Sequence, residues 1–125
     1  MDEQDLIYDW NEIDYEIERD ARRHPHELWF DDETLRDGLQ SPSARNPSIE
    51  QKIELIDFME ALGIQKADLG LPGAGPFHIG HIDEMLTHMG ENGYALRPGC
   101  AVRTVVSDIE PLIDLQAKHE RQIQA

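Results

Sequence analysis

The sequence predicts an α/β fold in which short parallel strands alternate with helices, and three observations lead to this prediction. Short apolar runs near residues 28–32, 64–71 and 100–106 are separated by segments long enough for helices of about ten to fifteen residues. Apolar residues within those segments recur at the three- and four-residue spacing of a helix face. The first run is apolar at consecutive positions, which is typical of a strand buried on both faces of a parallel sheet. Strands alternating with helices imply right-handed crossovers.

Length and charge limit the kinds of protein that fit. A chain of 125 residues allows one compact domain with a modest core. Acidic residues outnumber basic ones by 26 to 11, and the resulting net charge of -15 argues against nucleic acid or an anionic membrane as a partner. The single cysteine, Cys100, excludes an internal disulfide framework and favours the cytoplasm. The acidic N-terminus does not resemble a signal peptide, and no apolar run has the length of a membrane span.

Residues 1–27 are predicted to form a separate N-terminal helical arm. Leu6, Trp10, Ile13 and Ile17 follow helical spacing and indicate an amphipathic helix over about residues 5–23. The sequence His-Pro at 24–25 ends this helix. We expect the arm to pack on the body of the protein, residues 28–125, or on a second subunit.

The first β/α unit has the clearest local signals. A strand over residues 28–32 leads into a loop over residues 34–47. Ser48 and Gln51 form a capping box, which predicts the start of a helix, and Gly63 marks its end.

Two further units are expected to follow. A strand over residues 64–71 precedes a helix over 77–91, and a strand over 100–106 precedes a last helix. Asp108 is the predicted N-cap of that helix, with Pro111 tolerated in its first turn. Two folds fit this order: an open doubly wound sheet, or the start of a (β/α)₈ barrel, which needs roughly 250 residues.

Polar residues that could perform chemistry follow the predicted strands, where both folds bind ligands. Arg36, Asp37 and Gln40 follow the first strand, and Arg103 belongs to the third. A carboxylate can bind a divalent cation, and an adjacent guanidinium can stabilise an oxyanion beside it. Arg36 and Asp37 could equally form an ion pair that holds the loop, and Gln40 could orient a substrate or cap the loop.

Other candidates have simpler interpretations. The histidines at 78 and 81 are interpreted as a surface pair rather than as metal ligands. Cys100 is interpreted as a small buried residue rather than as a nucleophile. The glycine-containing loop at 72–76 allows either close approach of a ligand or a tight connection.

The segment Asp-Glu-Thr-Leu-Arg-Asp-Gly-Leu-Gln at 32–40 resembles the D-x-T-L-R-D-G-x-Q signature of 2-isopropylmalate, homocitrate and citramalate synthases. Hydroxymethylglutaryl-CoA lyase and the pyruvate carboxylase transferase domain resemble it more distantly. Residues 67–77 are similar to the second strand of this family and the helix that follows it, and residues 101–109 to its third strand and helix. The resemblance implies that residues 28–125 form the first three β/α units of a (β/α)₈ TIM barrel.

The resemblance also implies an activity: an acyltransferase of amino-acid biosynthesis that condenses acetyl-CoA with a 2-oxo acid through a metal-stabilised enolate. It implies that Asp37 binds the divalent metal ion, which could be Mg, Mn or Zn. Arg36 would stabilise the developing oxyanion as a catalytic and substrate-binding residue, and Gln40 and Arg103 would contact substrate. Full-length enzymes of this type are expected to be cytoplasmic homo-oligomers.

Some residues depart from the family pattern. Glu33, Leu39 and Asp68 replace residues typical of the synthases, and Gly-Leu-Gln at 38–40 is closer to the lyase version. The other metal ligands of the family, a His-x-His pair on a late strand, are not found in this sequence. We therefore expect an N-terminal fragment that is inactive alone. Two alternatives stay open: a lyase that cleaves a 3-hydroxyacyl-CoA, and a non-catalytic α/β module.

Overall fold

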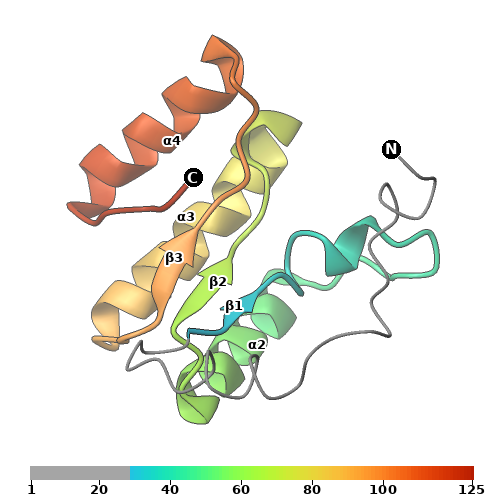
Figure 1. The fold of residues 1–125 in the computed structure, drawn as a ribbon, viewed down its shortest axis with the longest axis vertical. Helices are drawn as coiled ribbons and strands as arrows, with labels where there is room; N and C mark the ends of the chain where they lie inside the picture. The colour runs from blue at the N-terminus through green and yellow to red at the C-terminus, as the bar shows by residue number, and fades with distance from the viewer. Residues whose placement is uncertain (1–28) are drawn as a thin grey trace, which may run out of the picture.

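The computed structural model describes residues 29–125, and it confirms an α/β fold in which three parallel strands alternate with helices (Figure 1). The helix and the arm expected within residues 1–27 lie outside the described residues. The sheet has the order β1-β2-β3. Its strands are β1 (Asp31–Asp32), β2 (Lys66–Asp68) and β3 (Arg97–Gly99). The helices are α2 (Ile49–Leu62), α3 (Pro76–Glu91) and α4 (Val106–His119), with short 3₁₀ turns η3 (Gly38–Gln40) and η4 (Pro72–Ala74).

After α4 the chain returns to the sheet beside β3. Gln124 forms a parallel bridge with Gly99, and its backbone exchanges hydrogen bonds with Pro98 and Cys100 at 3.0 and 2.8 Å. Residues around Gln124 thus occupy the position of a fourth parallel strand. The common doubly wound sheets reverse their strand order near the first strand, so that later strands pair beside β1. Here each strand lies beside the previous one, as in a (β/α) repeat that winds in one direction.

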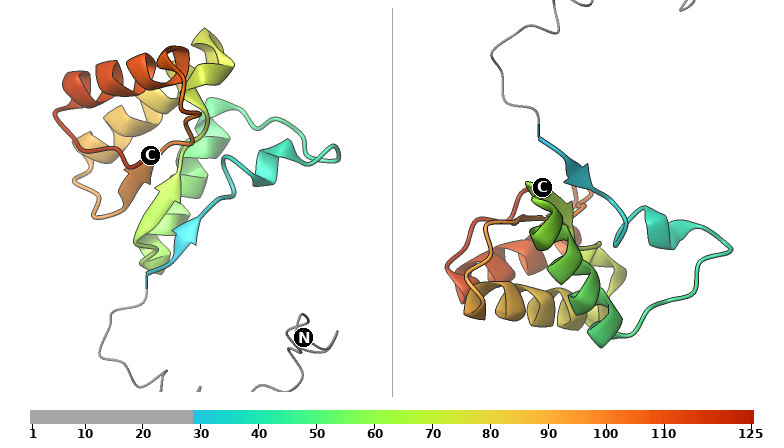
Figure 2. Two further views of the ribbon diagram at one scale, coloured as in Figure 1. Left: turned by 45° about the horizontal axis from the view of Figure 1, so that its top comes forward. Right: turned by 90° about the horizontal axis from the view of Figure 1, so that it is seen from below.

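The helices cover one face of the sheet, as Figure 2 shows in its right-hand view. α3 packs between α2 and α4. Buried side chains from all three helices meet the strands in one core, which includes Ile56, Met85, Leu86, Met89 and Leu112. Of the described helices, none is long and apolar enough to cross a lipid bilayer.

The local signals of α2 are confirmed. Ser48 accepts a hydrogen bond from the Gln51 backbone at 3.3 Å, and the Gln51 side chain accepts one from the Ser48 backbone at 3.0 Å. Gly63 ends the helix with a left-handed backbone, φ 73°, which glycine adopts without steric cost.

The prediction that the first strand is buried on both faces is wrong. Within the part of that run which the structure describes, Trp29 is 45% exposed and Phe30 is 69% exposed. The reason is that β1 is an edge strand: it pairs only with β2 in this sheet. The guanidinium of Arg97 lies 4.1 Å from the centre of the Trp29 ring and covers one face of it.

The predictions for the third strand and the last helix also need correction. The strand is Arg97–Gly99 rather than residues 100–106, and α4 begins at Val106 with Val105 as its N-cap. Pro98 and Gly99 are unfavourable strand residues, but pairing with β2 on one side and with Gln124 on the other fixes their conformation. Asp108 is not the cap because its carboxylate lies inside the first turn and binds Arg103.

Candidate active site

The loop that follows β1 folds back on itself at the carboxyl end of the sheet. The backbone carbonyl of Glu33 accepts hydrogen bonds from the amides of Arg36 and Gly38, at 3.2 and 3.0 Å. The Asp32 carboxylate accepts one from the Thr34 amide at 2.8 Å. These local bonds form a tight turn that holds the Arg36 side chain towards the end of β2.

Arg36 is surrounded by three carboxylates. Its guanidinium donates a hydrogen bond to Asp37 at 3.2 Å, contacts Glu33, and lies 3.6 Å from the Asp68 carboxylate. The Glu33 contact, together with the charges of Asp37 and Asp68, raises the pKa of Arg36. The predicted Arg36–Asp37 pair is therefore present, as part of a larger ionic cluster.

Asp68 ends β2 and is 7% exposed. One of its oxygens accepts a hydrogen bond from the Gly70 amide at 2.9 Å, but burial dominates and raises the pKa of the carboxyl group. The sequence placed Asp68 at the end of the predicted second strand and marked it as a departure from the family pattern, but it did not predict a contact with Arg36. Its contact with Arg36 depends on the pairing of β1 with β2, which no local signal reports.

A cavity of about 240 Å³ opens beside this cluster. Arg36 and Gln40 line it, together with Lys52 from α2 and His78 from α3, while Asp37 and Arg103 do not. The structure thus brings Arg36 and Gln40 to one cavity. Asp37 is placed next to Arg36 but outside that lining.

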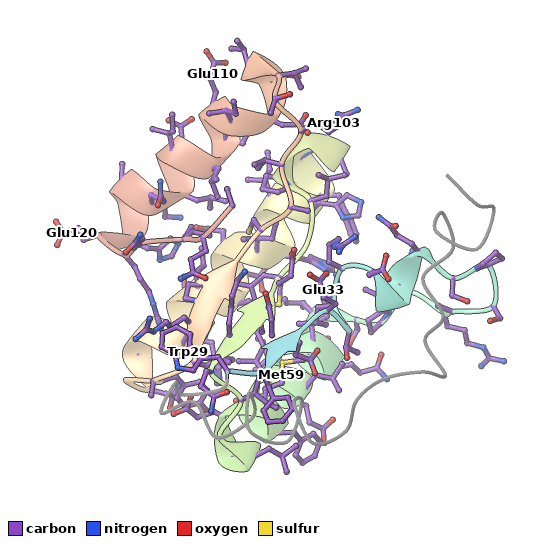
Figure 3. All side chains as sticks on the ribbon, viewed as in Figure 1. Trp29, Glu33, Met59, Arg103, Glu110 and Glu120 are labelled. Carbon is purple, nitrogen blue, oxygen red and sulfur yellow. The ribbon has the colours of Figure 1, made fainter. Side chains whose placement is uncertain are left out.

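Arg103 lies elsewhere, in the loop between β3 and α4, and Figure 3 shows it well separated from Glu33. Its guanidinium donates two hydrogen bonds of 2.8 Å to the carboxylate of Asp108, which also accepts one of 3.0 Å from the Arg103 amide. These bonds lower the pKa of Asp108 to about 2. The Arg103 side chain is 66% exposed, so part of its guanidinium can still face a ligand.

The low pKa of Asp108 predicts a loss of stability in acid. A carboxyl group whose pKa falls on folding stabilises the fold above its unfolded pKa, about 3.8, and this contribution disappears as pH falls towards 2. We expect chemical denaturation to show a larger loss of stability between about pH 4 and pH 2 in the wild type than in Asp108→Asn, since the amide does not titrate. Parallel pH profiles for the two proteins would contradict this assignment.

The described residues do not complete a metal site. Within residues 29–125, no group of three or more His, Cys, Asp and Glu side chains is arranged to hold a metal ion. Glu33, Asp37 and Asp68 converge on the Arg36 guanidinium instead. A single carboxylate such as Asp37 does not hold a divalent cation tightly, so these residues supply at most part of a coordination sphere.

Cys100, His88 and His119 contribute to packing or to contacts between helices. Cys100 is buried, and burial raises the pKa of its thiol to about 12, which agrees with its interpretation as a packed residue. His88 contacts Asp57 of α2 at 2.7 Å, and His119 contacts Asp83 of α3 at 2.8 Å. These two histidines join neighbouring helices.

Comparison with known proteins shows distant, partial similarity to two synthases. Over 52 residues the chain is 42% identical to a 2-isopropylmalate synthase from Sediminispirochaeta smaragdinae, covering 42% of the chain and 10% of that protein. Over 92 residues it is 33% identical to homocitrate synthase AksA from Methanopyrus kandleri, covering 72% of the chain and 21% of that protein. The chain thus spans about a fifth or less of the length of these relatives. No family model and no solved structure matches it.

Proposed function

We propose that residues 28–125 form the N-terminal part of a (β/α)₈ catalytic domain, preceded by a helical arm over residues 1–27. The domain belongs to an acyltransferase that condenses acetyl-CoA with a 2-oxo acid. The observation that carries this proposal is the position of Arg36, which lies at the carboxyl end of β1, within reach of the β2 carboxylate Asp68 and on the wall of a cavity. Active sites of (β/α)₈ enzymes lie at this end of the strands.

Two further features support a larger barrel. The pairing of Gln124 beside β3 continues the one-directional strand order. Large apolar side chains are exposed at both sides of the repeat, at Trp29 and Phe30 near β1 and at Val106 and Ile113 on α4. Exposed apolar surfaces of this kind are typical of interaction sites. Additional β/α units that pack at these two sides would bury the exposed side chains.

In this proposal each site residue has one task. Arg36 stabilises the oxyanion that develops when the enolate of acetyl-CoA attacks the 2-oxo acid, and Gln40 orients the substrate. Asp37 contributes one oxygen ligand to a divalent cation, whose chemistry is to polarise the 2-oxo group. Arg103 contacts substrate through the part of its guanidinium that Asp108 leaves exposed. The cation needs ligands besides Asp37.

A lyase is the second candidate, and Leu39 is the observation that favours it. Leu39 lines the cavity in the Gly-Leu-Gln sequence that is closer to the lyase version of the motif. The same cluster could stabilise the enolate that leaves when a 3-hydroxyacyl-CoA is cleaved. Release of acetoacetate from such a thioester would identify the lyase, whereas release of free CoA from acetyl-CoA and a 2-oxo acid identifies the synthase.

The test compares the chain with the protein encoded by its complete reading frame. With Mg²⁺ or Mn²⁺ present, acetyl-CoA is offered with pyruvate, a branched 2-oxo acid or 2-oxoglutarate, and free CoA is detected with a thiol reagent. We expect the 125-residue chain to be inactive, because residues 29–125 supply only part of a metal site, and the complete protein to release CoA in a 2-oxo-acid-dependent manner. Turnover by the isolated chain would contradict the first expectation, and a complete protein without turnover would contradict the proposed function.

A further inference from the structure

We propose that the cavity beside Arg36 is a carboxylate-binding pocket in which Lys52 supplies the positive charge, and that it takes a short aliphatic acid. Lys52 lies in the first turn of α2 and is 7% exposed. It lines the cavity together with Gln40, Asn46 and His78, which are polar but do not carry a fixed charge.

The charge of Lys52 has no partner in the part of the chain that the structure describes. Among residues 29–125, its ammonium group forms no hydrogen bond and no ion pair, and burial lowers its pKa. Buried lysines are normally paired, because removing an ammonium group from water is costly unless another charge or acceptor replaces the water. A lysine that is more than nine-tenths buried on a cavity wall, with no partner for its charge among the described residues, therefore indicates a missing anion.

Arg36 does not provide this function in the observed arrangement. Its guanidinium is already surrounded by Glu33, Asp37 and Asp68. Arg36 therefore offers a bound carboxylate less net positive charge than Lys52, whose ammonium group has no carboxylate partner among the described residues. In a protein with a net charge of -15, a local cation of this kind is what allows an anionic ligand to bind.

The shape and lining of the cavity define the ligand further. Its volume of about 240 Å³ has room for roughly eight groups of the size of a water molecule, which excludes the whole of CoA. Much of the wall is apolar. The apolar side chains come from the segments that follow β1 and β2 and from α3, and they are Leu39, Leu69, Leu71 and Phe77. An acid with a short apolar chain fits both properties, because its chain can contact the apolar wall while its carboxylate reaches Lys52.

This inference rests on the proposed function, because it assigns the carboxylate-binding residue of the cavity that Arg36 and Gln40 also line. Binding at Lys52 itself needs neither acetyl-CoA nor a metal ion. The experiment below measures binding only, so its failure is separate from a failure of the condensation assay.

The test is isothermal titration calorimetry on the 125-residue chain with pentanoate, pentanamide and inorganic phosphate as probes. Pentanoate and pentanamide share their chain and differ in charge, and phosphate is an anion without an apolar body. We expect pentanoate to bind, with at least tenfold weaker binding of pentanamide and of phosphate. Equal affinity for pentanamide would refute the role of the charge, and preference for phosphate would refute the aliphatic carboxylate.

Two variants assign the effect to one residue. Lys52→Met keeps the length of the side chain and removes its charge, and we expect it to weaken pentanoate binding at least tenfold. Lys118→Met is the matched control, because Lys118 is an exposed lysine on α4 that pairs with Asp83, and pentanoate affinity should not change. Unchanged affinity in Lys52→Met would overturn the proposal.

Circular dichroism shows whether Lys52→Met is folded. We expect this variant to melt at a higher temperature than the wild type, because it no longer buries an unpaired charge.

Discussion

Replacement of Arg36 by alanine is expected to lower the kcat of the complete enzyme by about 10²–10³-fold. A guanidinium directed at a developing oxyanion stabilises the transition state more than the ground state, and removal of one such donor typically has an effect of this size. Steady-state release of CoA from acetyl-CoA and the preferred 2-oxo acid measures it. This expectation rests on the proposed function.

The structure predicts that charge alone will not restore this activity. Arg36 contacts Glu33, Asp37 and Asp68 with different nitrogen atoms, and the single ammonium group of a lysine cannot reproduce this arrangement. Arg36→Lys should therefore preserve most of the thermal stability while recovering little of the lost kcat. Arg45→Ala is the matched control, because Arg45 lies exposed in the same loop, and it should leave kcat unchanged.

The outcome that contradicts this prediction is an Arg36→Ala enzyme with nearly normal kcat and a lower melting temperature. Arg36 would then be the ion-pair residue that holds the loop, which is the other interpretation of the Arg36–Asp37 sequence. A lower melting temperature alone does not decide between the two, because removing Arg36 leaves Asp68 buried without its cationic neighbour.

The parts of the fold that the sequence predicts well are those fixed by neighbouring residues. The capping box of Ser48 and Gln51 and the left-handed Gly63 define α2 from within the segment itself. β3 is different, because residues 97–99 have poor strand propensity and become a strand only by pairing with β2 and Gln124. Strands of two or three residues are set by their neighbours in space, so their boundaries are not visible in the sequence.

The same distinction applies to the candidate site. The Arg36–Asp37 contact joins adjacent residues, and its position after a strand made it predictable. Asp68 and Lys52 come from other elements, and their roles depend on burial, which the sequence does not state. In the sequence Lys52 resembles an ordinary lysine on a helix surface. The structure shows that the residue is only 7% exposed and lines a cavity together with residues of the preceding loop and of α3.

Replacement of Gly73 by alanine is expected to destabilise the fold by about 1–3 kcal/mol, although it adds a single methyl group. A Cβ atom at this position would lie 2.1 Å from one oxygen of the Asp108 carboxylate and 2.3 Å from its carbon. The carboxylate is fully buried and is held by three hydrogen bonds from Arg103, so it cannot move aside without breaking them. At Gly73 the 72–76 loop is a tight connection, because η4 and α4 approach each other too closely there for a side chain.

Denaturant unfolding of two alanine variants and one double variant tests this packing. Gly80→Ala is the control, because Gly80 lies within α3 with open space around it, and alanine there should stabilise the fold by about 0.5–1 kcal/mol. Asp108→Ala should itself destabilise the fold, because Arg103 loses its partner, but it removes the atoms with which the new methyl group collides. The effect of Gly73→Ala should therefore be much smaller in the Asp108→Ala background than in the wild type, as expected for residues in direct contact. Additive effects of the two substitutions would show that the Asp108 carboxylate is not what excludes a side chain at position 73.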